Sequence, residues 1–115
     1  MLTTISIDVA LRNQDGDTPL HEAVRMGYIE SARFLLEHGA DVNAHGMHEN
    51  TPLHYAVYWN YMDLVALLLE HGADFNAPNA NGSTPMHWAA KNGYTKITSL
   101  LMEHGARCKR PRPLW

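Results

Sequence analysis

The chain has 115 residues, of which 45% are apolar and 18% charged, and this is enough for one small folded domain. Its single cysteine, Cys108, excludes an internal disulfide, and no apolar run approaches the roughly 18 residues of a membrane-spanning helix. Residues 1–13 also lack the basic start and long apolar stretch of a secretory signal, so we expect a cytosolic or nuclear protein without a membrane segment.

Two motifs recur along the chain with the same period of 33 residues. Thr-Pro-Leu-His or Thr-Pro-Met-His begins at Thr18, Thr51 and Thr84, and Leu-Leu-Glu-His-Gly-Ala or Leu-Met-Glu-His-Gly-Ala begins at Leu35, Leu68 and Leu101. Because two independent motifs keep one period, we divide the chain into three repeats, 13–45, 46–78 and 79–109.

Residues 1–12 precede the first repeat and match only the tail of a repeat, since Asp8-Val9 aligns with Asp41-Val42. We interpret them as the remnant of a preceding repeat that lacks its helices. Residues 1–5 are expected to form one apolar turn that covers part of the first repeat, and a frayed end is the alternative.

Each repeat is predicted to contain two short helices, as the second one illustrates. Thr51 can accept a backbone N–H at the start of a helix, where proline at the next position costs no hydrogen bond. We expect this helix to end near Asn60, where the other repeats have glycine, because asparagine also tolerates the left-handed conformation. The second helix spans about residues 62–70, and Gly72 ends it.

Two further features distinguish the repeats from one another: a turn residue in the second repeat and the composition of the second helix in the third. Glu49 replaces the turn glycine found at Gly16 and Gly82, and a non-glycine residue is strained there if the turn needs a positive φ. We therefore expect the loop 46–50 to differ from its neighbours. In the third repeat the second helix carries Thr95, Lys96, Thr98 and Ser99 where the second repeat has Met62, Asp63, Val65 and Ala66. A more polar helix of this kind is typical of a terminal, capping repeat.

Residues 13–109, with these two motifs at this period, resemble ankyrin repeats. The resemblance implies an all-α solenoid of stacked antiparallel helix pairs, joined by β-turn or hairpin loops, in which each repeat buries its apolar faces against its neighbours. It further implies a non-catalytic module that binds a partner protein and needs no cofactor.

The resemblance also implies where a partner binds, because loop tips and first helices line a concave groove in ankyrin repeats. The residues that match the groove positions are Gln14, Asp15, Asp17, Arg25, Met26, Met47, His48, Asn50, Tyr58, Trp59, Ala80, Asn81, Ser83, Lys91 and Asn92. Tyr58 and Trp59 place large amphipathic side chains at its centre, as in a binding hot spot. The alternative for both is side-chain contact with the next turn, whereas Trp88 is expected in the core.

Eight histidines raise the question of a metal site. Six belong to the repeated motifs, and equivalent residues of stacked helices lie about 10 Å apart, too far to share a zinc ion whose ligands lie about 2 Å away. His45 and His48, with Glu49 nearby, remain as a lone pair, so we predict no metal site.

Catalytic and phosphate-binding motifs are not evident either. Cys108 and the serines lack a nucleophile motif, and the glycines are those of turns and helix ends. Asp15 and Asp17 are expected in a solvated turn. The sequence therefore predicts no enzyme.

The alternatives to a simple binding module are regulatory roles, and the first of them is hydroxylation of asparagine. Leu35 with Asn43, and Leu68 with Asn76, match the pattern that an oxygen-dependent asparaginyl hydroxylase recognises in ankyrin repeats, although both asparagines are also expected to brace their turns. If the modification occurs, we expect it at Asn43 first.

The charge distribution adds a further regulatory alternative. Residues 1–106 carry a net charge of −7 and residues 107–115 a net charge of +4. An acidic body argues against nucleic acid as a ligand. Residues 110–115 form a basic, proline-containing tail, and residues 109–112 match a short nuclear-import signal or a solvated tail. The chain is expected to be a monomer, and a regulatory fragment or isoform of a longer array is the alternative to a separate binding module.

Overall fold

The structure is a computed structural model that describes residues 8–108, with the backbone alone for residues 106–108. Three helix pairs follow one another along the chain: α1 Pro19–Arg25 with α2 Ile29–Glu37, α3 Pro52–Tyr58 with α4 Met62–Glu70, and α5 Pro85–Lys91 with α6 Thr95–Cys108. A short 3₁₀ helix, η1 Met47–Glu49, lies between α2 and α3. Residues 8–108 contain no β-strand, so the expected all-α solenoid is confirmed. The predicted apolar turn of residues 1–5 and the basic tail lie outside the described residues.

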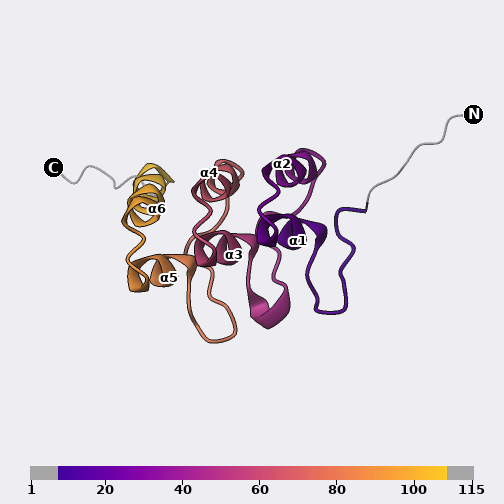
Figure 1. The fold of residues 1–115 in the computed structure, drawn as a ribbon, viewed down its shortest axis with the longest axis horizontal. Coiled ribbons are helices and arrows are strands. Elements are labelled where there is room, and N and C mark those ends of the chain that lie inside the picture. Colours follow the sequence, from indigo (N-terminus) through magenta and orange to yellow (C-terminus); the bar gives the residue numbers. More distant parts are fainter. Residues whose placement is uncertain (1–7, 109–115) are drawn as a thin grey trace, which may run out of the picture.

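The helices form two rows that run along the stack (Figure 1). The first helices α1, α3 and α5 make one row and the second helices α2, α4 and α6 make the other, while the loops between repeats project from the side of the first helices. Each first helix contacts its own second helix, and α3 contacts the first helices of both neighbouring repeats, α1 and α5. Stacking of neighbours thus supplies the contacts that a single repeat cannot make alone.

Every first helix begins with the same reciprocal capping arrangement. The hydroxyl oxygens of Thr18, Thr51 and Thr84 accept hydrogen bonds from the backbone N–H groups three residues later, at 3.3, 3.3 and 3.0 Å. In return, the Nδ1 atom of each motif histidine accepts from the backbone N–H of its threonine. The predicted helix starts are confirmed, and two backbone donors at each start have partners.

Residues in the left-handed conformation end the helices at most of the expected positions. Gly27, Asn60 and Gly93 follow the first helices with φ of 75°, 60° and 71°, which confirms Asn60 as the substitute for glycine. Gly72, with φ of 88°, follows α4. The third repeat differs, because α6 continues through Gly105 to Cys108.

The core runs along the stack between the two rows of helices. Its largest fully buried apolar side chains include Leu20, Leu53, Leu68, Ile97 and Leu101. Burying a side chain of this size contributes about 1.5–3 kcal/mol to the free energy of folding. On α6, Thr95, Lys96 and Ser99 are exposed, and the capping role of this repeat stays a prediction.

Candidate functional site

The three loop tips share one hydrogen-bonded turn. The backbone N–H of Asn79 donates to the carbonyl oxygen of Ser83 at 2.9 Å, and the same bond closes the first and second tips. The side-chain oxygen of Asn79 also accepts from the backbone N–H groups of Asn81 and Ser83. Side chains on the tips are therefore held at repeated, ordered positions beside the first helices.

The second tip has the same closing hydrogen bond but a different backbone conformation, and the sequence predicts a difference in this loop. Glu49, which stands where the other tips have glycine, has a positive φ of 62°, and the preceding His48 has a positive φ of 55°. Non-glycine residues adopt this conformation at a cost of about 1 kcal/mol or more, so surrounding contacts must hold it. The carbonyl oxygen of His48 accepts from the backbone N–H of Ala80 at 2.9 Å, which joins the second tip to the third.

Asp17 lies under the second tip, and its expected place in a solvated turn is wrong. Its side chain is 2% exposed. The carboxylate accepts hydrogen bonds from the hydroxyl of Tyr55 at 3.0 and 3.1 Å and from the backbone N–H of Met47 at 2.9 Å. Gly46 provides the space, because a Cβ atom there would come within 2.1 Å of the carboxylate. Asp17 therefore positions the groove and does not face it.

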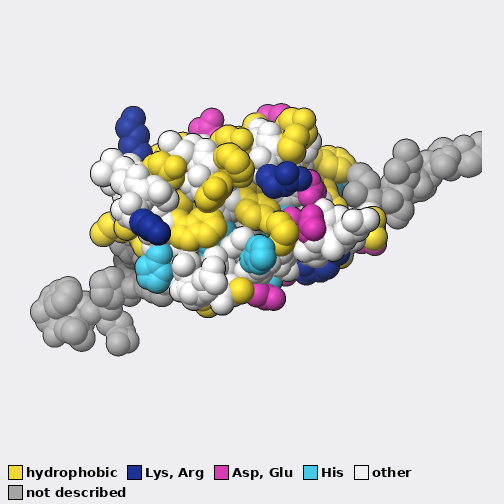
Figure 2. Space-filling model, turned by 60° about the horizontal axis from the view of Figure 1, so that its bottom comes forward, with side chains coloured by type: hydrophobic (Ala, Val, Ile, Leu, Met, Phe, Trp, Pro, Cys, Tyr) yellow, Lys and Arg dark blue, Asp and Glu magenta, His cyan; other side chains and the backbone are white. Residues whose placement is uncertain are grey.

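The other predicted groove residues mostly lie at the surface. Gln14, Asp15, Arg25, Met26, Met47, His48, Tyr58, Trp59, Ala80, Asn81, Lys91 and Asn92 are exposed, and Asn50 and Ser83 are half-buried. Figure 2 brings the loop side of the molecule forward and shows hydrophobic side chains gathered across the middle of this face. Acidic side chains lie toward the end that holds the first repeat.

An aromatic cluster, which we define as Tyr58, Trp59 and Trp88, lies on α3 and α5 in the middle of the predicted groove. Tyr58 meets Trp59 edge to face, with ring centroids 5.0 Å apart and planes at 88°. Tyr58 also meets Trp88 at 5.5 Å and 61°. Tyr58 and Trp59 remain 54% and 49% exposed, so the rings support one another without being buried.

Trp88 belongs to this cluster, although the sequence predicts it in the core. It is half-buried, with its ring 5.3 Å from that of His54 and one side against the core. The repeat register gives no clear signal for this, because Trp88 occupies the position of Glu22, which is half-buried, and of Tyr55, which is buried in the core.

Charges around the cluster differ between its two ends. On α1, Arg25 forms an ion pair with Glu22, and this hydrogen bond raises the pKa of the Arg25 guanidinium. Glu22 also accepts from the side-chain amide of Asn13 at 2.7 Å. On α5, Lys91 is exposed and forms no ion pair within residues 8–108. The aromatic centre thus lies between a neutralised charge pair and a free cation.

Comparison with known families agrees with this architecture. A family model described as ankyrin repeats (3 copies) matches residues 44–112, and one described as ankyrin repeat matches residues 15–46. The chain belongs to the ankyrin-repeat family. Members of this family are non-catalytic modules for protein–protein interaction.

Individual relatives match shorter segments of the ankyrin stack. The chain is 46% identical to the NF-kappa-B inhibitor cactus of Drosophila melanogaster over 37 residues, which are 32% of this chain and 7% of that protein. It is 48% identical to the B-cell lymphoma 3 protein homolog of Mus musculus over 42 residues, 36% of this chain and 9% of that protein. It is also 46% identical to delta-latroinsectotoxin-Lt1a of Latrodectus tredecimguttatus over 44 residues, 38% and 4% of the two chains. The matched segments thus span less than a tenth of each relative.

Histidines join neighbouring ankyrin repeats. The Nε2 atoms of the buried His21 and His54 lie 2.8 Å from the carbonyl oxygens of Asn50 and Ser83 in the following repeat. Because Nδ1 accepts from threonine, Nε2 must carry the hydrogen that it donates. Burial is the main cause that lowers the pKa of both imidazoles, which favours this neutral form.

Metal and small-molecule sites find no support among residues 8–108. No group of three or more His, Cys, Asp or Glu side chains in this range could hold a metal ion. His45 instead hydrogen bonds through Nδ1 to the carbonyl oxygen of Glu49 at 2.8 Å.

No helix among residues 8–108 is long and apolar enough to cross a membrane.

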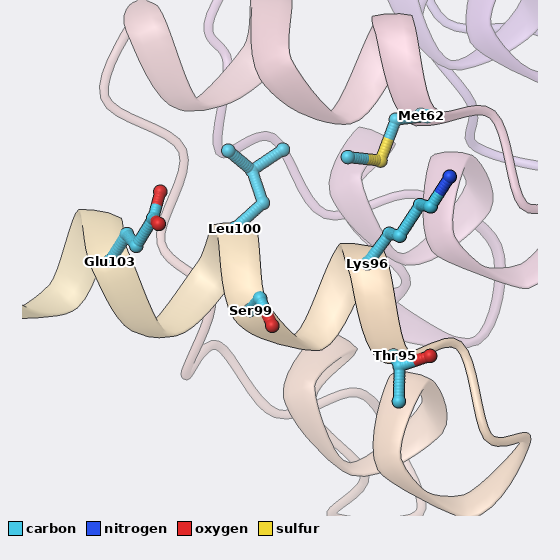
Figure 3. Close-up of a pocket in the computed structure, with 6 residues that line it drawn as sticks. All are labelled: Met62, Thr95, Lys96, Ser99, Leu100 and Glu103. Carbon is cyan, nitrogen blue, oxygen red and sulfur yellow. The ribbon is translucent and has the colours of Figure 1, made fainter.

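A shallow depression of about 330 Å³ lies between α4 and α6 (Figure 3). Leu100 and Met62 line it together with exposed polar residues of α6, and it belongs to the row of second helices. The polar side chains that line it are all exposed, so none is held in place to orient a small ligand. The groove with its aromatic cluster is therefore the candidate functional site of this ankyrin stack.

Proposed function

We propose that this chain is a protein-binding module whose partner lies in the groove formed by the loop tips and first helices. The observation that carries the proposal is the aromatic cluster, in which Tyr58 and Trp59 are about half exposed yet held by edge-to-face contacts. Exposed aromatic side chains that are already ordered lose little conformational entropy on binding, so they are effective contact residues.

Flanking residues extend this surface along the stack. Gln14, Asp15, Arg25 and Met26 would contact the partner from the first repeat, and Ala80, Asn81, Lys91 and Asn92 from the third. Met47, His48 and Asn50 would contribute from the second tip, and Ser83 lies half-buried beside them. Asp17 would act indirectly, because it holds Tyr55 and the second tip in place.

The partner is expected to be a protein, because the chain belongs to the ankyrin-repeat family. One of the relatives, cactus, is named an inhibitor of NF-kappa-B. The matched segment covers 7% of that protein, so its partner is not transferred to this chain. We further propose that the module acts in the cytosol or nucleus, because a chain with one cysteine cannot form the internal disulfides that are common in small secreted domains.

A selection with matched variants tests this proposal. A displayed library of protein fragments is selected on the wild-type chain, and each retained fragment is measured against two double variants. Tyr58→Ala with Trp59→Ala removes the cluster, whereas Tyr28→Ala with Phe34→Ala removes two exposed aromatics that lie outside the predicted groove.

We expect the first double variant to lose about thirtyfold or more in affinity, which corresponds to a hot spot of about 2 kcal/mol, and the second to bind as the wild type does. Circular dichroism serves as the control that both variants fold. Equal binding by the wild type and the cluster variant would refute the proposal.

Hydroxylation of asparagine is a second candidate, and the structure changes which site we favour. The Asn43 amide donates to the carbonyl oxygen of Gly72 at 3.2 Å and accepts from the backbone N–H of Asp74 at 2.8 Å. Asn76 is exposed, and its side chain makes no hydrogen bond within residues 8–108. We therefore propose Asn76 as the preferred site, the reverse of the order expected from sequence. Peptide mass measurement after incubation with the hydroxylase tests this, and oxygen gained on Asn43 alone would contradict it.

The basic tail remains a proposal from sequence. Residues 109–112 combine three cations with a proline and would direct nuclear import of the module. Fusion of residues 107–115 to a fluorescent reporter tests it, and an unchanged distribution between cytosol and nucleus would refute it.

A further inference from the structure

The first helices present three different kinds of side chain at one position of the repeat. Their last residues are Arg25 of α1, Tyr58 of α3 and Lys91 of α5, and all three side chains are exposed. Because α3 contacts both α1 and α5, these equivalent positions form one row along the groove. A partner in the groove therefore meets the three side chains in the order of the repeats.

The two cations of this row differ in what they can bind. Arg25 forms an ion pair with Glu22, whose carboxylate also accepts from the side-chain amide of Asn13 at 2.7 Å. Lys91 forms no ion pair within residues 8–108. A carboxylate of a partner is therefore attracted by Lys91, whereas at the first repeat it meets the negative charge of Glu22 together with the cation.

Apolar surface extends from the aromatic cluster in the other direction, toward the first repeat. The residues that follow the three first helices are Met26, Trp59 and Asn92. Met26 is 50% exposed and Trp59 49%, and Met47 on the second tip is 36% exposed. Hydrophobic side chains cross the middle of this face (Figure 2). The apolar surface thus covers the first two repeats and gives way to polar residues at the third.

Charges on the loop tips favour the same order. Asp15 on the first tip and Glu49 on the second are exposed, and the third tip, residues 79–83, has no charged residue. Arg12 is the cation beside the first two tips, and its guanidinium donates to two backbone carbonyl oxygens at 2.6 Å. The tip carboxylates repel an acidic group placed over the first two repeats, and no such repulsion acts at the third tip.

We propose that the partner is a protein segment with a fixed chemical order: apolar side chains over Met26 and the aromatic cluster, then an acidic side chain over Lys91. The inference rests on the proposed binding function and adds the charge of the partner and its direction along the stack. Neighbouring helices lie about 10 Å apart. The acidic residue is therefore about three residues from the apolar anchor in an extended segment, and about seven in a helical one.

A displayed library of random peptides, long enough to span three repeats, tests the proposal. Peptides are selected on the wild-type chain, and those that also bind the Tyr58→Ala, Trp59→Ala double variant are discarded. We expect the remaining peptides to share a large apolar residue and an aspartate or glutamate at a constant spacing from it. This constant spacing identifies the acidic residue whose contact is then measured.

An exchange of charge between chain and peptide locates that contact. Lys91→Glu should lower the affinity for the most enriched peptide by about fivefold or more, because an attraction becomes a repulsion. The same peptide with lysine in place of its acidic residue should bind Lys91→Glu better than it binds the wild type. Lys96→Glu makes the same change of net charge at an exposed position of α6, outside the groove, and should leave the affinity unchanged. Circular dichroism is the control that both variants fold.

The outcomes separate this inference from the binding function on which it rests. Peptides that need the aromatic cluster but share no acidic residue would overturn the inference and leave the proposed function standing. Failure to select any peptide that needs the cluster would overturn both. An equal loss of affinity in Lys91→Glu and Lys96→Glu, or a lysine peptide that still prefers the wild type, would show that the acidic residue does not lie over Lys91.

Discussion

The Nε2 atom of His54 lies 2.8 Å from the carbonyl oxygen of Ser83, so one imidazole joins the second repeat to the third. Its Nδ1 atom accepts from the backbone N–H of Thr51 at 3.0 Å. The side chain is fully buried, and both ring nitrogens are occupied only in the neutral form with hydrogen on Nε2. The same residue therefore begins a helix and couples two repeats.

Replacing this histidine should destabilise the stack much more than replacing its exposed counterpart. His54→Ala leaves the Thr51 N–H without its partner and opens a cavity, so we expect a loss of about 2–4 kcal/mol in the free energy of unfolding. His87→Ala should cost less than about 1 kcal/mol, because that ring is exposed. Urea denaturation of both variants checks this, and equal losses would contradict the coupling role.

Stability should fall when the solution becomes mildly acidic. Burial lowers the pKa of His21 and His54, so the unfolded chain binds protons at a higher pH than the folded chain. The stability due to this difference is fully present above the unfolded pKa of about 6.5, and it is lost as the pH falls below that value. A protonated Nδ1 also cannot accept from threonine.

Urea denaturation at a series of pH values from about 7.5 to 5 measures this loss. His21→Gln with His54→Gln should be less stable at neutral pH but show a shallower decline, whereas His87→Ala should keep the decline of the wild type. A free energy of unfolding that stays constant or rises over this interval would rule out the proposed protonation effect.

A methyl group at position 46 should disturb the buried carboxylate beneath the second loop tip. Gly46 has φ of −114° and ψ of −137°, which lies outside the main regions that alanine adopts, and a Cβ atom there would lie 2.1 Å from Oδ1 of Asp17. We expect Gly46→Ala to cost about 1–3 kcal/mol.

A double-mutant cycle identifies the cause. Asp17→Ala alone leaves the Tyr55 hydroxyl without its acceptor, yet in that background Gly46→Ala should cost less than it does in the wild type. The cost that remains comes from the backbone conformation and from Nε2 of His21, which lies 2.9 Å from the Cβ position. An unchanged cost of the glycine substitution in the Asp17→Ala background would show that the contact with the carboxylate is not its origin.

The two motif asparagines should differ in their contribution to stability. Asn43 bridges two repeats through Gly72 and Asp74, so Asn43→Ala should cost about 1–3 kcal/mol. Asn76→Ala should change stability by less than about 0.5 kcal/mol, because its exposed side chain holds no hydrogen bond within residues 8–108. Thermal unfolding of both variants compares them directly. Equal effects would favour the expectation from sequence that both asparagines brace their turns.

Most of the architecture could be predicted because it depends on local chemistry that is repeated. The Thr-Pro starts of α1, α3 and α5, and the left-handed Asn60 with φ of 60°, follow from residues within one turn of each position. The 33-residue period then predicts the stack, since equivalent faces must meet.

Features that depend on contacts between repeats could not be predicted from the sequence. Asp17 is buried because Gly46, distant in the chain, lacks a side chain and Tyr55 supplies a donor. Trp88 is half-buried because its ring contacts those of Tyr58 and His54 in the preceding repeat, which register alone does not reveal. Asn43 bonds to the turn that follows α4, which ends before Gly72. Asn76 has no described equivalent of these bonds, because α6 continues through Gly105, the counterpart of Gly72, and no such turn forms there.

Nuclear magnetic resonance of the labelled chain tests most directly that the aromatic groove is the binding surface. A protein fragment retained in the display selection is titrated into the wild-type chain, and shifts of side-chain resonances are followed. We predict the largest shifts at Tyr58, Trp59 and Trp88, with smaller shifts at Met26 and Lys91. Met102, on the opposite side of the third repeat, serves as the reference. Largest shifts on the outer surfaces of α2, α4 and α6, with the aromatic cluster unchanged, would contradict the account.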